Sequence, residues 1–574
     1  MNSLRNAFTF SAVFHVVNLD AERKGMSHMK AIVYVRPTPE NLKLLRTELA
    51  DPKCMEYHLF FSNIVPSGFL QKLAEADKHF VVKQVHEYYA DFYPVNHDFF
   101  TINLGSALVM KQPKESSLAG LSSAEAHFQR CVDGIASVLL ALKIKPMVRY
   151  QQTSSLAFQL GKAVDNLMVE QRAQFTFSNR EKPPVLLVLD RKEDPITPLL
   201  SQWTYQAMIH ECVGLWNNRV DLSKTKEGKK TPEVILSILY DEFFAKHMHS
   251  NFGEFAEAVQ GILKEYKELK SSHGKVASIE DMQKFVEKYP EIRKKSATVD
   301  KHVALMSELN RQLDTRKMFE MSELEQEIAC GDNQSEHFGR VKELIADPGL
   351  QPFDALRLTA IFAIRYESSA TRQISELRAM LGHKGLGDGD IALIDALLQY
   401  GGVARRGGDL FGTSGGLLTS WRKSLSRSIA GVQNVFAQHR SLCAQEVEKL
   451  MQNKLPKTSY PYCTKALGAK QEPGTVIVYI IGGATFEEAM QVATINATLP
   501  RGRRVILGGS AVLNSKSFLA EVRKLAMYRG SGGGAAPGGG GIAAAGGGGE
   551  GKAAGRRRPT AAAASAGGSG VFGL

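Results

Sequence analysis

Two aspartates that directly follow a buried strand are the side chains best placed in this sequence to do chemistry. Residues 185–189 (VLLVL) form a short apolar run behind two prolines, which predicts a strand buried on both faces of a parallel sheet. Asp190 ends the run and Asp194 lies just beyond it. Binding sites in such sheets lie at the carboxyl ends of strands, so these carboxylates could serve as a catalytic acid or as magnesium ligands. The favoured alternative is a structural role for both aspartates, in which they cap the loop and form an ion pair with Arg191 or Lys192. It is favoured because the sequence has no phosphate-binding motif beside these aspartates.

Three glycine motifs could bind phosphate or present a nucleophile, and none has the context that its chemistry needs. Gly482-Gly483 and Gly508-Gly509 follow predicted strands, but neither completes G-x-G-x-x-G, and the sequence has no G-x-x-x-x-G-K-[ST]. Tight turns explain both pairs. Residues 412–416 (GTSGG) match the serine-hydrolase elbow in spelling, yet a polar glycine loop precedes them in place of the required strand. We therefore expect no nucleotide cofactor and no nucleophilic serine.

Histidines and cysteines show no pattern of metal ligation. His210, His247, His249 and His302 have no ligand spacing with acidic or thiol residues. The six cysteines form no C-x-x-C pair, and scattered thiols in a large chain indicate a reducing compartment. We expect no metal, no cofactor and no enzymatic activity. The alternative is an aspartate-based, magnesium-dependent phosphohydrolase of α/β fold.

The length and the net charge of the chain limit which class of protein it can be. A chain of 574 residues is too long for one core, so two to four domains are expected. The net charge of +12 suits an acidic partner or a membrane surface, and we find no zinc-finger spacing and no aromatic-basic RNA signature. The only features that would indicate nucleic-acid binding are this charge and the arginine run at 556–558, so we expect no nucleic-acid partner. No window approaches the ~18 consecutive apolar residues of a membrane span.

The first 220 residues alternate between strand and helix patterns, which indicates α/β domains with parallel sheets. Strands are predicted at 31–38, 57–63, 145–150 and 185–189, and helices at 40–49, 68–76, 122–142, 154–175 and from about 199. Residues 81–88 could be helix or strand, and residues 92–104 are expected to close the first unit. From about 221 to 440 helix follows helix. Strands return at 475–483 and 504–509, and Thr485 with Glu488 predicts a capping box between them. One domain is thus expected to interrupt another.

A long, charged helical segment within that interruption is expected to project from the body. Residues 279–289 and 292–329 are predicted to form a helical pair around Tyr289-Pro290. Its apolar positions are spaced by threes and fours: Val299, Val303, Met306, Leu309 and Leu313. A helix so polar elsewhere cannot be fully buried, so we expect this stripe to face a partner.

Residues 186–222, LLVLDRKEDPITPLLSQWTYQAMIHECVGLWNNRVDL, closely resemble the Sec/Munc (SM) family of syntaxin-binding proteins. Further segments resemble its endosomal and trans-Golgi branch: AIVYVRPTPENL, FSN with LAEAD, IEDMQKFVEKYP, YGGVARRGGDLF and VIVYIIGGATFEEA. The resemblance covers roughly residues 29–528. It implies an arch-shaped SM-protein fold, α/β plus α, with two parallel-sheet α/β domains and a large, mostly helical domain inserted into the second.

The domains implied by the residues and the resemblance together are an atypical N-terminus (1–28), a first α/β domain (29–105), the first part of the second α/β domain (106–220), the helical domain with its projecting hairpin (221–437), the second part of the second domain (438–528) and a disordered Gly/Ala-rich tail (529–574). The family begins with a strand-helix unit that residues 1–28 do not resemble. We expect either that residues 8–17 substitute a strand or that the reading frame is incomplete.

The resemblance also implies the function. The chain would be a SNARE-assembly chaperone that binds a syntaxin-type Qa-SNARE and the assembling SNARE complex, and that promotes vesicle docking and fusion in endosomal, trans-Golgi and vacuolar transport. It would be a cytoplasmic monomer that reaches trans-Golgi and endosomal membranes through its partners.

By alignment with the family, Leu70 and Glu87 would hold the N-terminal peptide of syntaxin, Leu70 in an apolar pocket and Glu87 at its polar edge. The alternative for Leu70 is ordinary core packing. The residues that would belong to the SNARE-templating hairpin are Pro290, Val299, Val303 and Met306. Such helix-in-groove recognition needs an apolar stripe on a charged scaffold.

Overall fold

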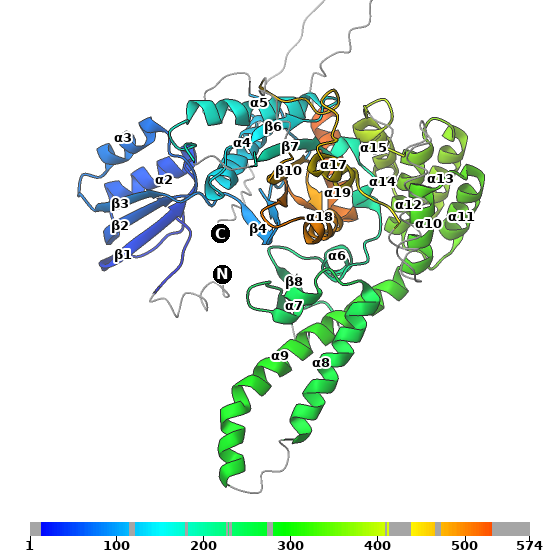
Figure 1. Ribbon diagram of the computed structural model, residues 1–574, viewed down its shortest axis with the longest axis horizontal. Helices are drawn as coiled ribbons and strands as arrows, with labels where there is room; N and C mark the ends of the chain where they lie inside the picture. The colour runs from blue at the N-terminus through cyan, green and yellow to red at the C-terminus, as the bar shows by residue number, and fades with distance from the viewer. Residues whose placement is uncertain are drawn as a thin grey trace, which may run out of the picture. The chain divides into compact units, whose positions relative to one another are not determined.

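The computed structural model describes residues 13–113, 121–177, 182–225, 228, 232–272, 279–407, 410–411, 438–464 and 472–530; the side chains of 269–272 and 279–292 are not described. The chain forms two compact units, which Figure 1 shows in ribbon form. The first contains Met1–Phe61, Val65–His86 and Arg529–Leu574, and the second Ser62–Ile64 and Glu87–Tyr528. The glycine motif at 412–416, the residues before 13 and the tail beyond 530 lie outside the described residues.

The first unit is a three-stranded sheet with two helices. Its elements are β1 (Met26–Val35), α2 (Pro39–Ala50), β2 (Cys54–Phe61), α3 (Ser67–Ala76) and β3 (Val82–Glu87), with strand order β1-β2-β3. Thr38 caps α2 by accepting a hydrogen bond from the Asn41 amide at 3.3 Å. Leu45, Phe69 and Leu59, one from each of α2, α3 and β2, meet in a common core. The expected elements are therefore confirmed, and residues 82–87 are a strand.

The second unit is built on a six-stranded sheet. Its strands are β4 (Tyr93–Asn96), β5 (Phe99–Thr101), β6 (Met147–Tyr150), β7 (Val185–Asp190), β10 (Thr475–Ile481) and β12 (Arg504–Gly509), in the order β4-β5-β12-β10-β7-β6. All neighbours run parallel except β4 and β5. Every residue of β7 and β10 is buried, as the apolar runs predict.

Residues 92–104 do not close the first unit as expected, because β4 and β5 join this second sheet. Phe99 of β5 pairs with Leu507 of β12, more than 400 positions away in the chain. All three residues of β5 are buried. A strand buried on both faces needs a sheet that is covered on both sides, and the second unit provides one.

Helices cover both faces of the six-stranded sheet. The helices that pack on it are α4 (Ser123–Ala141), α5 (Ser155–Glu170), α17 (Leu442–Met451) and α18 (Phe486–Thr498). Leu186 and Val188 of β7 pack with α4 and α5, whereas Leu187 and Leu189 pack with α17 and α18. The predicted capping box of Thr485 is confirmed at the start of α18.

The helix expected from residue 199 begins later. A short 3-10 helix, η2 (Thr197–Leu199), is followed by non-helical residues, then by α6 (Tyr205–Met208) and the π-helix η3 (Ile209–Val213). The delay has a local cause, since Thr204 bridges to Asn251 and the Trp203 carbonyl accepts from the Phe252 amide at 3.1 Å.

The residues between the two halves of this sheet form the helical block. After a short antiparallel ribbon, β8 (Arg219–Asp221) and β9 (Glu233–Ile235), its helices are α7 (Glu242–His247), α8 (Phe252–Ser272), α9 (Ile279–Thr315), α10 (Met318–Cys330), α11 (Gln334–Ala346), α12 (Pro352–Tyr366), α13 (Thr371–His383), α14 (Asp388–Ile391) and α15 (Leu393–Gly401). The chain ends its described part with β11 (Ala484–Thr485), β13 (Val512–Leu513) and α19 (Ser515–Gly530), and α19 packs into the core of α10 to α15. Among the described residues, no helix has the length and apolar character that a bilayer crossing requires.

The two glycine pairs have different roles. Gly482 (φ 91°) and Gly483 (φ 111°) form the expected turn in a backbone region that favours glycine. The turn expected at Gly508-Gly509 is wrong, because both residues lie inside β12. A Cβ at Gly508 would lie 2.1 Å from the Phe100 ring, so close packing explains this glycine.

Gly508→Ala is expected to lower the free energy of unfolding by about 1–3 kcal/mol, the usual cost of overpacking a core. Urea unfolding measures the change, and adding Phe100→Leu should restore part of it. Gly261→Ala in α8, where a Cβ meets nothing within 4 Å, is the control. It should stabilise by about 0.5–1 kcal/mol, because alanine favours a helix interior. An equal loss from both substitutions would contradict the packing explanation.

Candidate functional site

The carboxylates of Asp190 and Asp194 are occupied by structural donors. Asp190 accepts hydrogen bonds from the Ser154 hydroxyl at 2.6 Å and the Lys192 amide at 3.1 Å, and burial raises its pKa. Asp194 accepts from the amide and hydroxyl of Thr197, at 3.1 and 2.6 Å, and lies 3.9 Å from the Arg191 guanidinium. The capping interpretation is confirmed. The arrangement leaves the phosphohydrolase alternative without support.

The strongest interaction at this strand end joins Arg191 to Glu488, and sequence reasoning missed it. The buried guanidinium donates to both carboxylate oxygens of Glu488, at 2.8 and 2.6 Å, and to the Gly483 carbonyl at 3.1 Å. Burial opposes its charge, but Glu488 and Asp194 outweigh burial and raise the pKa of Arg191. The only sequence signal for Glu488 was its capping box. This network links two distant chain segments and is structural.

Metal binding finds no support in the described part of the chain, where no group of three or more His, Cys, Asp or Glu side chains could hold an ion. His210 is buried, packs edge-on against Phe486 with ring centroids 5.1 Å apart, and has no hydrogen-bond partner at Nδ1 among the described residues. Burial lowers the pKa of His210 to about 4, so its ring is neutral at pH 7.

The helical pair α8–α9 extends away from the six-stranded sheet of the second unit (Figure 1). α9 has 37 residues and is about 55 Å long. The predicted pair around Tyr289-Pro290 is wrong, because Pro290 lies inside α9, while α8 ends at Ser272 and α9 begins at Ile279. A proline usually marks a helix boundary in a sequence, but it can also lie within a long helix, as it does here.

The apolar stripe of α9 is only partly available to a partner. Val299 is 3% exposed, and Leu309 and Leu313 are fully buried by the rest of the second unit, so the expectation that the whole stripe faces outward is wrong for these three. Val303 and Met306 are partly buried against the same core and keep some exposed surface. The reason is that the basal half of α9 shares its core with one face of the six-stranded sheet.

A buried polar anchor fixes the base of the hairpin. Tyr205 of α6 stacks on Phe255 of α8, with ring centroids 3.7 Å apart, and its hydroxyl lies 2.7 Å from Nδ1 of His302 on α9. Nε2 of His302 lies 3.2 Å from a carboxylate oxygen of Asp241, which also pairs with Lys301. His302 was expected only to be exposed or satisfied, and no spacing in the sequence points to this cluster.

The protonation states within this anchor follow from burial and charge. Burial lowers the pKa of His302, and Asp241 opposes that shift without reversing it. Burial alone would raise the pKa of Asp241, but the hydrogen bond and charge from His302, together with Lys301, lower it. A neutral His302 therefore donates from Nε2 to Asp241 and accepts at Nδ1 from the Tyr205 hydroxyl. One hydrogen-bonded network therefore joins α6, the residue before α7, and α9 at the hairpin base.

The two residues expected to hold a syntaxin peptide lie in different units. Leu70, on α3 of the first unit, is 43% exposed, which excludes ordinary core packing for it. Glu87 ends β3 and belongs to the second unit, where its carboxylate accepts a hydrogen bond from the Tyr89 hydroxyl at 2.8 Å. Burial and this hydrogen bond raise the pKa of Tyr89 to about 12.

Comparison with known proteins places this chain among close relatives. It matches the Sec1 family over residues 1–521. It is 38% identical to vacuolar protein sorting-associated protein 45 of Dictyostelium discoideum over 511 residues, 89% of this chain and 88% of that protein. It is 34% identical to the protein of the same name from Saccharomyces cerevisiae over 525 residues, 89% of each chain.

The comparison with solved structures agrees with the sequence comparison. The SM protein Vps45 in complex with the Qa SNARE Tlg2 (1-310) matches with a TM-score of 0.81 and 37% identity, over 91% of this chain and 90% of that one. The Unc18–syntaxin 1 complex from Monosiga brevicollis, at 20% identity and a TM-score of 0.69, shares the fold over 88% of this chain and 90% of that one. The expected SM-protein fold, with parallel-sheet α/β regions and a large helical part, is confirmed. The chain therefore belongs to the Sec1 family.

Proposed function

We propose that this chain is a non-enzymatic SNARE-assembly chaperone, which binds a syntaxin-type Qa-SNARE and promotes SNARE-mediated docking and fusion in endosomal, trans-Golgi and vacuolar transport. One observation carries the proposal: the match over nine-tenths of both chains to a Vps45 protein solved with the Qa SNARE Tlg2. Such a protein lowers the entropic cost of association by holding partner helices in register. It works as a monomer and reaches trans-Golgi and endosomal membranes through its partners.

The helical hairpin supplies the templating surface in this proposal. Residues 221–437 act as a domain inserted between the two α/β parts, 106–220 and 438–528. This division is supported by the pairing of β7 with β10, which lie on either side of the insertion. The anchor of His302, Tyr205 and Asp241 supports a rigid hairpin, because a template must hold its shape while its partners move.

Four hairpin residues take different roles in this proposal. Val303 and Met306 contact the SNARE helix through their exposed surface. Val299 supports them from the core. Pro290 belongs to the distal half of α9 that extends the template. The charged face of the helix keeps the hairpin soluble until a partner covers the apolar surface.

A second contact takes the N-terminal peptide of the Qa-SNARE. Leu70 provides an apolar contact, and its exposed position on α3 supports this role. Glu87 provides a polar contact for a basic peptide. Its carboxylate lies at the end of β3 and accepts a hydrogen bond from the Tyr89 hydroxyl at 2.8 Å.

The function is tested with the full chain and the purified cytosolic part of an endosomal Qa-SNARE from the same organism. A one-to-one complex is expected by size-exclusion chromatography with light scattering. Val303→Asp should slow SNARE assembly tenfold or more, because a charge replaces an apolar contact at the centre of the template. Val303→Ala removes similar packing without adding charge, so it is the matched control and should keep most of the rate.

The two outcomes that would contradict these statements are distinct. Absence of any complex with the Qa-SNARE would refute the function. A Val303→Asp variant that folds, binds and assembles SNAREs at the wild-type rate would remove the hairpin from the mechanism. Circular dichroism of both variants separates a lost contact from a lost fold.

A further inference from the structure

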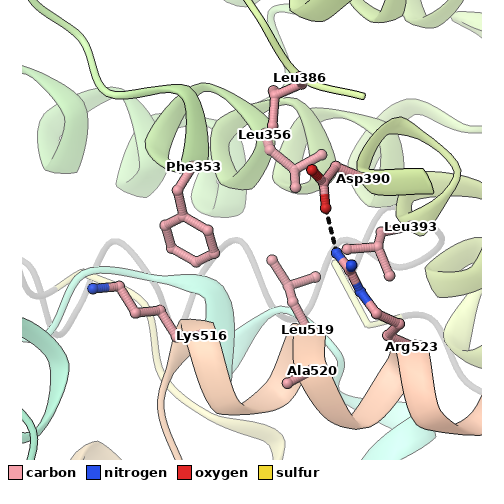
Figure 2. Close-up of a pocket in the computed structure, with 9 residues that line it drawn as sticks. All are labelled: Phe353, Leu356, Leu386, Asp390, Leu393, Lys516, Leu519, Ala520 and Arg523. Atoms are coloured by element: carbon pink, nitrogen blue, oxygen red, sulfur yellow. Dashed lines mark hydrogen bonds and ion pairs between the residues drawn. The ribbon is translucent and has the colours of Figure 1, made fainter. Parts of the chain in front are cut away.

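A groove between α12, the α13–α15 segment and α19 lies apart from the hairpin and has an apolar floor. Figure 2 shows the side chains of α19 facing those of α12 across it. The apolar lining residues are Phe353, Leu356, Leu386, Leu393, Leu519 and Ala520. Its volume is about 270 Å³. A cavity of about 150 Å³ accepts a benzene ring, so this groove has room for one or two apolar side chains.

The walls of the groove are held by ordered backbone. Leu386 follows Gly385, which has φ 92°, and its amide donates to the Leu381 carbonyl at 3.2 Å. This arrangement is a helix stop that fixes the next apolar side chain in place. Leu356 and Leu519 form the buried floor. Ala520 of α19 also lines the groove, is exposed, and has the smallest side chain among the lining residues.

Charge at the groove is mostly positive and is arranged along one face of α19. Lys516 and Arg523 lie seven residues apart, about 10 Å along the helix, with Ala520 between them. Arg523 pairs with Asp390 across the groove, as the dashed line in Figure 2 marks. Lys516 lies 5.8 Å from the Phe353 ring centroid and has no carboxylate within ion-pair distance in the described part of the chain. The Lys516 charge also acts on the Asp354 carboxylate, and a negative charge on an occupant is favoured at this end.

We propose that this groove binds an amphipathic helix of a partner protein, which places two adjacent apolar side chains on the floor between acidic residues spaced seven apart. The spacing of Lys516 and Arg523 equals two helical turns, so a helix laid along α19 aligns one carboxylate with each cation. Arg523 can serve a second carboxylate besides Asp390, since a guanidinium has five donors. The inference concerns a different face from the hairpin and does not depend on SNARE binding.

The test uses phage-displayed 16-residue peptides selected against the full chain and counter-selected against Ala520→Arg. An arginine at this exposed helical position fills the groove at little cost to the helix. Enriched peptides are expected to carry an apolar pair flanked by acidic residues at helical spacing. A synthetic peptide from this pool should bind Ala520→Arg and Lys516→Glu at least tenfold more weakly than wild type, by fluorescence anisotropy.

Two controls make the result specific. Ala497→Arg, the same change at an exposed position of α18, should bind the peptide like wild type. A peptide whose first acidic residue is changed to lysine should recover binding to Lys516→Glu. Circular dichroism of each variant confirms its fold.

Three results would overturn the proposal. The first is a selection that yields no peptide able to distinguish wild type from Ala520→Arg. The second is an enriched pool without acidic residues. The third is binding of phosphatidylserine vesicles that Ala520→Arg abolishes, without any peptide binding, which would assign the groove to an anionic lipid.

Discussion

Arg191→Met is expected to lower the free energy of unfolding of the second unit by about 3–5 kcal/mol, because it leaves buried carboxylates without their cation. The guanidinium is 1% exposed and is held by both oxygens of Glu488. Methionine fills a similar volume, so the loss reports uncompensated charge more than an empty space. Urea unfolding followed by tryptophan fluorescence measures it, since Trp203 is in the core of this unit.

If uncompensated charge causes the loss, removing the charge of Glu488 should restore part of the stability. Adding Glu488→Gln to Arg191→Met should recover at least half of the loss, because the capping box survives while the buried charge at that position is gone. Arg372→Met, at an exposed position of α13, should change stability by no more than about 0.5 kcal/mol. A double variant as unstable as the sum of its single variants would show that Arg191 and Glu488 do not act as a pair.

Acidification from pH 7 to pH 4 is expected to remove about 3 kcal/mol of stability through His210 alone. Its pKa is about 4 in the folded chain and 6.5 in the reference state. Below pH 6.5 the unfolded chain therefore binds a proton that the folded chain does not, and the free energy of unfolding falls by about 1.4 kcal/mol per pH unit until the folded-state pKa is reached. Above the unfolded-state pKa of 6.5, His210 is neutral in both states and removes no stability.

His210→Leu should remove this part of the pH dependence while keeping an apolar contact with Phe486. Urea midpoints measured between pH 7.5 and pH 4 test it. Some slope will remain, because burial also lowers the pKa of His302, His249 and His337. A variant with the full wild-type slope would mean that His210 is protonated as readily in the folded chain as in the unfolded one.

Local patterns in the sequence were sufficient for the elements whose signals are local. The apolar run at 185–189 is a buried strand, the helix predicted at 40–49 lies within α2, and the Thr485 capping box forms as expected. In each case the side chains that decide the structure lie within a few residues of one another. The family and the fold were predicted from the resemblance of residues 186–222 to the SM family.

Such local patterns could not predict contacts between residues that lie far apart in the sequence. The sheet membership of Phe99 depends on Leu507, and the role of Arg191 depends on Glu488, nearly 300 residues away. The burial of Val299 also depends on a surface supplied by other segments. The prediction at Pro290 failed for a different reason, because proline usually marks a helix boundary and here lies within the long helix α9.

The order of strands in the second unit has a consequence for synthesis on the ribosome. β7 pairs with β10, but about 290 residues of chain separate the end of one from the end of the other. At a synthesis rate of roughly 5–20 residues per second, β7 emerges roughly 15–60 seconds before its neighbour exists. During that interval β7 lacks its β10 neighbour and the α17 and α18 helices that pack on Leu187 and Leu189. This unpaired edge and apolar face need shielding from aggregation, so nascent chains of this protein should be clients of ribosome-associated chaperones.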